Sequence, residues 1–150
     1  MRKKILITVK TYPVISKKYQ ETVCTAGLRE DGSWIRLYPV PFRTMDDCKK
    51  FRKYQWLTAT LTARPKDQRP ESYSPDRDSI EAGPIIDRSN QWNERCRWVL
   101  EKGTVHDNMT DLIRLAKVEN KLSLATYKPK EIIDLIHEPT DREWSENLQK

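Results

Sequence analysis

The chain has 150 residues and a formal net charge of +6, and 37% of its residues are hydrophobic while 33% are charged. A chain of this length forms a single domain over residues 1–150, or two very small ones, and it can bury a core without a metal or disulfides. Five Trp and six Tyr residues exclude the class of disordered proteins, which are depleted in aromatics.

The positive charge is concentrated in the first half of the chain. Residues 1–75 contain 16 Lys/Arg and 7 Asp/Glu, a net charge of +9, whereas residues 76–150 contain 12 and 15, a net charge of −3. A basic excess of this kind favours either a polyanionic partner or an ordinary solvated basic surface.

The first element that we expect is a strand over residues 5–9, where Ile5, Ile7 and Val9 alternate with Leu6 and Thr8. This apolar run is too short for the core of a signal peptide or for a membrane span. Cysteines stand at wide, unclustered positions, which indicates no zinc site and no disulfide framework. We therefore expect a cytoplasmic protein without a metal or cofactor.

A hairpin follows, formed by residues 21–28 and 33–38 around the turn at residues 30–32. Gly27 lies inside the first of these strands and indicates a bulge or a close backbone approach. In the second strand, side chains alternate between two faces. One face carries Trp34, Arg36 and Tyr38, and the opposite face carries aliphatic residues that suit a core.

Further along the chain, residues 44–54 predict a helix with acidic residues in its first turn and basic residues in its last. Residues 55–64 alternate cleanly and predict a half-buried strand. Residues 65–78 contain three prolines and seven charges, which is typical of an exposed and functional loop. Residues 79–86 predict a short edge strand, because Pro84 lies within them.

The last third of the chain predicts two helices and two strands. The helices are expected from residue 89 or 90 to residue 102, where Gly103 follows, and over residues 107–119. The strands are expected over residues 122–127 and 131–137, and a last helical segment opens at Thr140. Together these elements predict an α+β fold, namely a small curved antiparallel β-barrel, OB-like or similar, of about five to seven strands with inserted helices.

The face that carries Trp34, Arg36 and Tyr38 is the first candidate site. Aromatic rings stack on unpaired bases, and an arginine between them pairs with phosphate or lies on a base plane. Small barrels use such a strand face to bind single-stranded nucleic acid. The alternative is structural: Trp34 packs in the core and Arg36 pairs with a carboxylate.

A basic group after the hairpin is the second candidate. On the expected helix, Lys49, Arg52 and Lys53 fall at i, i+3 and i+4 and share one face. Such a face either tracks phosphates or is an ordinary solvated surface. The full set of expected nucleic-acid contacts is Trp34, Arg36, Tyr38, Arg43, Lys49, Lys50, Arg52 and Lys53.

Signatures of catalysis are sparse. The sequence has no glycine-rich phosphate loop and no G-x-S-x-G motif. The histidines His106 and His137 each precede an acidic residue, which is common at surfaces. Four acidic residues could belong to a metal-dependent nuclease or nucleotide hydrolase, namely Asp76, Asp78, Glu81 and Asp87. No spacing selects them, so no catalytic residue is assigned.

Residues 24–40, CTAGLREDGSWIRLYPV, resemble the opening hairpin of uncharacterised bacterial proteins described as containing a dual OB domain. The shared residues are Cys24, Ala26, Gly27, Trp34, Ile35 and Arg36. The sequence departs from the family at Leu37 and Tyr38, because the family has its proline directly after the arginine and this chain has it only at residue 39. The resemblance implies an OB-like barrel with a nucleic-acid or nucleotide ligand. Residues 123–144 also resemble longer bacterial proteins, which implies that the chain is the N-terminal portion of a longer architecture.

The function predicted from the sequence is binding of nucleic acid, single-stranded or RNA, by the aromatic and arginine strand face and the basic helix. One alternative is a protein-interaction or scaffold module, in which residues 65–78 and the acidic second half contact a protein partner. The other is the nuclease or nucleotide hydrolase. No membrane association is expected.

Overall fold

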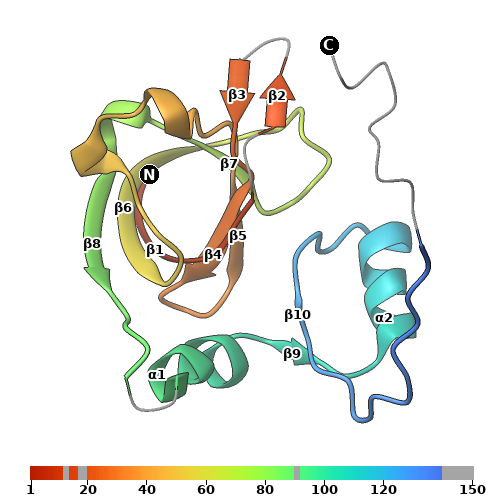
Figure 1. Ribbon diagram of the computed structural model, residues 1–150. Helices are drawn as coiled ribbons and strands as arrows, with labels where there is room; N and C mark the ends of the chain where they lie inside the picture. The colour runs from red at the N-terminus through yellow and green to blue at the C-terminus, as the bar shows by residue number, and fades with distance from the viewer. Residues whose placement is uncertain (12–13, 17–19, 90–91, 140–150) are drawn as a thin grey trace.

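The structure is a computed structural model and describes residues 1–11, 14–16, 20–89 and 92–139. Its centre is a closed β-barrel of five strands, drawn in red, orange, yellow and green in Figure 1. Following the hydrogen-bonded neighbours around the barrel gives the order β1-β4-β5-β7-β6, and β6 pairs back with β1. The bounds of these strands are Arg2–Lys10 for β1, Thr25–Arg29 for β4, Trp34–Leu37 for β5, Gln55–Ala63 for β6 and Ser72–Pro75 for β7.

Four of the five strand pairs in the barrel are antiparallel, and the pair β5–β7 is parallel. Numbering the barrel strands along the chain gives the closed order 1-2-3-5-4-1, with the third and fifth strands parallel. This is the connectivity of an OB-like barrel. The expected small α+β barrel is therefore confirmed, with mixed rather than purely antiparallel pairing.

Shorter strands extend this barrel. β8, Glu81–Ile85, pairs with β6 on one side and is the edge strand expected at residues 79–86. β2, Val14–Ser16, and β3, Gln20–Thr22, form a small hairpin between β1 and β4. β9, Val105–His106, and β10, Thr126–Tyr127, form a separate parallel pair.

The interior of the barrel is aliphatic because each strand turns alternate side chains inward. Ile35 and Leu37 of β5 are fully buried there, together with Ile5 of β1 and Leu57 of β6. Phe51, 1% exposed, belongs to the same core cluster. The inward face expected for the strand at residues 33–38 is confirmed.

A second apolar layer covers the outside of β1 and β6. Leu6 and Trp56 face outward there and form a cluster with Ile86, against which Trp98 packs. The Trp56 and Trp98 rings are 4.9 Å apart and meet edge to face. Trp98 belongs to the helix expected up to residue 102, which consists of α1, Asn93–Cys96, and its π-helical continuation η5, Arg97–Lys102.

Gly27 confirms the expectation of close backbone packing. A Cβ atom at this position would lie 2.2 Å from the carbonyl oxygen of Leu6 in the adjacent β1. β1 also has a register shift between Ile7 and Val9, opposite the same part of β4. Only glycine permits the two strands to approach this closely.

Residues 103–127, drawn from green to blue in Figure 1, lie beside the barrel and line a cavity together with residues around the turn between β4 and β5. Their helix consists of α2, Met109–Ile113, continued by η6, Arg114–Val118. Asn108 caps α2 through its side-chain oxygen, which accepts from the backbone N–H groups of Thr110 and Asp111. The helix expected over residues 107–119 is thereby confirmed.

The helix expected over residues 44–54 is wrong. Two short 3-10 turns, η1, Phe42–Thr44, and η2, Asp47–Lys49, stand in its place, and the backbone is extended at Met45 and Lys50. Met45 and Phe51 are both buried in the barrel core. Residues six positions apart on a regular helix point to different sides, so a helix could not bury both. Tertiary packing therefore overrides the local helix preference.

Two further expectations need correction. Residues 65–78 are not all loop, because they contain β7 and the 3-10 turn η3, Arg77–Ser79. Of the strands expected over residues 122–127 and 131–137, the first is reduced to β10 and the second is irregular. The segment expected from Thr140 lies outside the described residues. No described helix combines the length and the apolar character that crossing a membrane requires.

Candidate functional site

Arg36 is the centre of a buried polar network at the end of β5. Its side chain points outward from the barrel, yet the residue is only 7% exposed. Its Nη1 donates to Asp67 Oδ2 at 3.1 Å and to Ser72 Oγ at 3.0 Å. Ser72 opens β7, and Arg36 is its partner in the parallel β5–β7 pair, so the ladder itself places these groups together.

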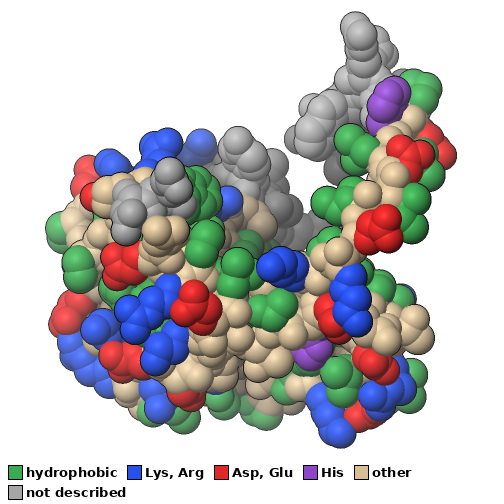
Figure 2. All heavy atoms as spheres, turned by 90° about the horizontal axis from the view of Figure 1, so that it is seen from below, with side chains coloured by type: hydrophobic (Ala, Val, Ile, Leu, Met, Phe, Trp, Pro, Cys, Tyr) green, Lys and Arg blue, Asp and Glu red, His purple; other side chains and the backbone are tan. Residues whose placement is uncertain are grey.

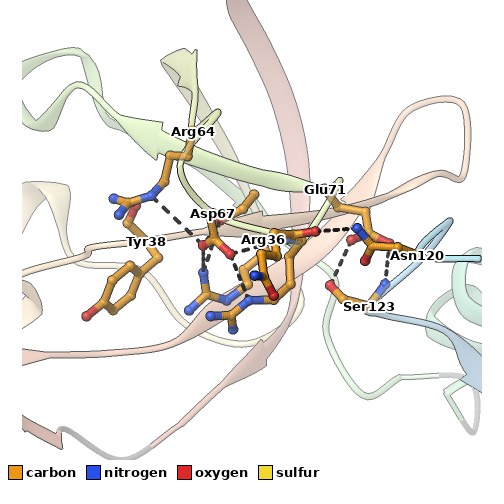
Figure 3. A network of polar contacts seen from close by, with 10 residues as sticks. Arg36, Tyr38, Arg64, Asp67, Glu71, Asn120 and Ser123 are labelled. Carbon is orange, nitrogen blue, oxygen red and sulfur yellow. Dashed lines mark hydrogen bonds and ion pairs between the residues drawn. The ribbon is translucent and has the colours of Figure 1, made fainter. Parts of the chain in front are cut away.

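The Asp67 carboxylate lies within ion-pair distance of Arg36, Arg64 and Arg69. Figure 3 shows Arg36 and Arg64 beside it. Ser72 Oγ donates to Asp67 Oδ2 at 2.8 Å, and the backbone N–H and Nε of Arg69 donate to Oδ1 at 3.2 and 3.0 Å. Burial of the carboxyl group would raise its pKa, but these hydrogen bonds and the Arg69 charge lower the pKa of Asp67 to about 2. Asp67 is therefore ionised at neutral pH.

Tyr38 follows β5 and lies beside two guanidinium groups. The Cζ atoms of Arg36 and Arg64 are 4.6 and 5.3 Å from the centre of its ring. Arg64 Nη1 also donates to the Tyr38 carbonyl oxygen at 2.9 Å. Tyr38 as a whole is half-buried.

An open cavity of about 670 Å³, which we call the Tyr38 cavity, lies next to this network. Its barrel side is formed by Tyr38 and by the loop between β6 and β7, which contributes three cationic side chains. Its other side comes from residues 116–123. The lining cations are Arg64, Lys66 and Arg69, and the lining acid is Asp67.

Two contacts hold residues 116–123 against the barrel. Glu71 accepts hydrogen bonds from the backbone N–H and the Oγ of Ser123 at 2.8 and 2.7 Å. Asn120 Nδ2 donates to the carbonyl oxygen of Gln68 at 2.9 Å. Both contacts appear at the right of Figure 3, and they make the second wall of the cavity part of the folded domain.

The structure separates the strand face that the sequence predicts as one surface. Arg36 and Tyr38 lie together, but Trp34 lines a different cavity of about 420 Å³ with Arg29 and His106. Trp34 is half-buried, and its Nε1 has no hydrogen-bond partner among the described residues. The three side chains therefore do not form one exposed face, because Arg36 is buried against Asp67 and Ser72 and Trp34 is half-buried in a cavity that residues 104–125 also line.

The basic residues that follow the hairpin do not share a helix face. Lys49 lies 3.9 Å from Asp46 and 3.4 Å from Asp78, and Lys50 contacts Asp47 at 2.6 Å. Their charges are thus locally balanced. Arg43 is exposed on η1, and Arg52 and Lys53 are exposed and line a third cavity. The expectation of one continuous basic helix is therefore corrected.

The net charge of +6 is not gathered into one basic patch on the face seen in Figure 2. There Lys and Arg side chains lie among Asp and Glu side chains over the barrel. Local geometry is therefore a better guide to an anion site than the overall charge of this face.

Sequence reasoning missed Arg64, Lys66, Asp67 and Arg69 as site residues. Arg64 ends the strand expected over residues 55–64, and the other three lie at the start of the proline-rich loop, which the sequence predicts to be exposed without selecting residues in it. The signal was the charged run R-P-K-D-Q-R at residues 64–69, next to a strand end. Over the residues that the structure describes, no group of three or more His, Cys, Asp and Glu side chains could hold a metal ion.

Comparison with known proteins gives one match. The model of the family described as "Domain of unknown function (DUF8758)" matches residues 1–101. The matched part contains the barrel, β8, α1 and nearly all of η5, whereas residues 103–127 lie beyond it. No curated protein and no solved structure matches the chain.

Proposed function

We propose that this chain, which belongs to the DUF8758 family, binds single-stranded nucleic acid or RNA at the Tyr38 cavity. The observation that carries the proposal is the cluster of cations beside Tyr38 on the loop between β6 and β7. OB-like barrels bind oligonucleotides with their second and third strands and with the loop that joins the fourth and fifth. In this barrel those parts are β4, β5 and residues 64–71.

The local charge supports a polyanionic ligand. Arg64, Lys66 and Arg69 line the cavity, and Arg36 lies behind it, against the single carboxylate of Asp67. The buried Arg36–Asp67 pair is neutral as a unit, so three lining cations remain in excess. Lys66 is exposed, and the side chain of Arg69 is 49% exposed, so phosphate can reach both.

Tyr38 and Arg64 supply the surface for a base. An aromatic ring and a guanidinium plane both accept stacked bases without reading their sequence. Arg36 takes a different role from the one expected from the sequence: it positions the loop through Asp67 and holds Tyr38, and it does not contact ligand. Asn120, with its side chain at the opposite wall, limits the width of the site.

The cytoplasmic location expected from the sequence belongs to the same proposal. Cys24, Cys48 and Cys96 are free thiols in the structure, and Cys48 and Cys96 are exposed. Exposed thiols persist where the surroundings are reducing. Nucleic acid is an available partner in that compartment.

Fluorescence anisotropy with mixed-sequence single-stranded DNA and RNA tests the proposal. We expect binding that weakens steeply between about 50 and 200 mM salt, because phosphate contacts release counterions. Lys66→Ala should reduce the slope of log affinity against log salt by about 1, and affinity by several-fold. Lys3→Ala, which removes the same charge from an exposed position on β1, should change neither.

Two results would overturn the proposal. One is the failure of any oligonucleotide to bind at low salt. The other is a salt slope that Lys66→Ala and Arg69→Ala leave unchanged, which would place any binding elsewhere on the molecule.

A further inference from the structure

The third cavity, of about 520 Å³, lies close to the apolar layer on the outside of the barrel, because Tyr54 belongs to both. We call it the Trp92 cavity. It lies between the start of α1 and the segments that flank β6 and β8, and it shares no lining residue with the Tyr38 cavity. Two aromatic rings and four cationic side chains line it, together with a single acid.

The two rings and one guanidinium form a compact unit. Tyr54 and Trp92 meet with their ring centres 5.8 Å apart at an interplanar angle of 68°. The Cζ atom of Arg95 is 4.3 Å from the Tyr54 ring centre and 5.0 Å from that of Trp92. Arg95 is 9% exposed, and its Nε and Nη2 donate to the carbonyl oxygen of Ile86 at 2.9 and 2.6 Å.

This unit is anchored on the barrel, yet it presents an indole to solvent. The backbone N–H of Tyr54 donates to the Ile7 carbonyl oxygen, and the Ile86 N–H donates to the Tyr54 carbonyl oxygen at 2.8 Å. Trp92 nevertheless remains 46% exposed. A large aromatic side chain that is held in place but left open suits the face of a planar ligand.

The backbone at both aromatic residues is in the left-handed region. Tyr54 has a φ of 60° and Trp92 a φ of 67°, values that bulky side chains rarely adopt. Each such residue costs about 1 kcal/mol or more, and such strain is concentrated at ligand-binding sites. Both residues line the same cavity.

Charge around the rings favours an anion. Arg52, Lys53 and Arg88 are exposed and line the cavity. The lining acid, Asp87, accepts hydrogen bonds from the backbone N–H and the Oγ of Ser89. Three exposed cations therefore line the cavity with one carboxylate, which is already hydrogen-bonded to Ser89, so the positive charge is in excess.

We infer that the Trp92 cavity binds a nucleoside 5′-phosphate, with the base against Trp92 and the phosphate held by Arg52, Lys53 and Arg88. Arg95 positions the two rings and does not contact the phosphate. The ligand is either a free nucleotide or the 5′-phosphorylated end of a strand, since both offer the same chemistry. This site is separate from the Tyr38 cavity and does not depend on the function proposed for it.

Isothermal titration calorimetry with adenosine 5′-monophosphate tests the inference on the full chain. We expect saturable binding that Trp92→Ala weakens by about 5- to 100-fold, because a stacked base contributes about 1–3 kcal/mol. Trp92→Phe keeps a ring and should retain most of the affinity. Arg88→Ala should weaken binding several-fold, whereas Arg97→Ala, at an exposed arginine on η5, should not.

The two sources of the ligand are distinguished by oligonucleotides with and without a 5′-phosphate. Preference for the phosphorylated strand, lost in Trp92→Ala, identifies a strand end. Binding of the mononucleotide without that preference identifies a free nucleotide. The inference is overturned when neither probe binds, or when both bind equally well to the wild type and to a folded Trp92→Ala variant. Lys66→Ala, in the Tyr38 cavity, should leave the mononucleotide titration unchanged.

Discussion

Arg36 and Asp67 form an ion pair at 3.1 Å, with side chains that are 8% and 10% exposed. The pair joins the third strand of the barrel to the loop between the fourth and fifth strands. In an OB-like barrel these are two parts of the binding surface. The ion pair therefore holds the two parts of the candidate site in place, but it is too buried to contact a ligand itself.

Asp67→Ala should strongly destabilise the fold. Removal of the carboxylate leaves the Arg36 guanidinium buried without its counterion, which typically costs about 3–5 kcal/mol. Urea unfolding, followed by circular dichroism, measures the change. Asp47→Ala is the matched control: the Asp47 side chain is 93% exposed where it pairs with Lys50, so its loss should change the free energy of unfolding much less than the loss of Asp67. Equal losses in the free energy of unfolding for the two variants would show that Arg36 and Asp67 do not form a buried ion pair.

The same carboxylate predicts a loss of stability in acid. The pKa of Asp67 is about 2 in the folded protein, against an ordinary value of 3.8. A depressed pKa stabilises the folded state fully above the ordinary value, and this contribution disappears as the pH falls from about 4 to about 2. It amounts to about 2 kcal/mol at 1.36 kcal/mol per pKa unit.

Comparison of the wild type with Asp67→Asn isolates this contribution from that of other carboxyl groups. The difference in their free energies of unfolding should be constant above about pH 5 and should narrow toward about pH 2. A difference that stays constant over this range would show that Asp67 does not titrate as the hydrogen bonds from Ser72 and Arg69 require.

The strands whose inward side chains are regularly aliphatic could be predicted from the sequence. Ile35 and Leu37 identify the core face of β5, and the alternation over residues 55–64 identifies β6. β7 could not be predicted in this way. Its four residues lie among prolines and charges, and Tyr73 alone packs against the barrel core from them, so the strand exists because it pairs with β5 and β6.

Only part of the candidate site could be predicted from the sequence: Arg36 and Tyr38 were expected, whereas the residues of the loop between β6 and β7 were not. Alternation places Arg36 on the outer face of β5, but it does not show what covers that face. Arg36 is buried against Asp67 and Ser72, which lie 31 and 36 positions away. The segment beside Trp34 is held by contacts such as that of Ser123 with Glu71, 52 positions apart. No local pattern carries such a contact, so the exposure of Trp34 and Arg36 could not be predicted.

Gly32→Ala should weaken the contact between the turn that joins β4 and β5 and the end of η5. Gly32 has a φ of 82°, and a Cβ atom there would lie 2.0 Å from the carbonyl oxygen of Lys102. Backbone strain and this clash together should cost at least about 2 kcal/mol in urea unfolding. At Gly103, a Cβ atom would lie 3.2 Å from the Val99 carbonyl oxygen at an ordinary negative φ. Gly103→Ala is thus the control and should lower the free energy of unfolding less than Gly32→Ala. A larger loss for Gly103→Ala would contradict the close contact between Gly32 and Lys102.

Trp98→Ala should release α1 and η5 from the outside of the barrel. The Trp98 ring packs on Leu6, Trp56 and Ile86, and its loss removes both buried area and the edge-to-face pair with Trp56. For a half-buried tryptophan we expect a cost of about 2–3 kcal/mol, below the 3–5 typical of a full core position. Trp92→Ala removes the same side chain where it is 46% exposed, and it should cost about 1 kcal/mol or less. Urea unfolding of both variants makes the comparison. Equal costs would mean that the indole of Trp98 does not anchor the helix, and that the second apolar layer depends on Ile86 instead.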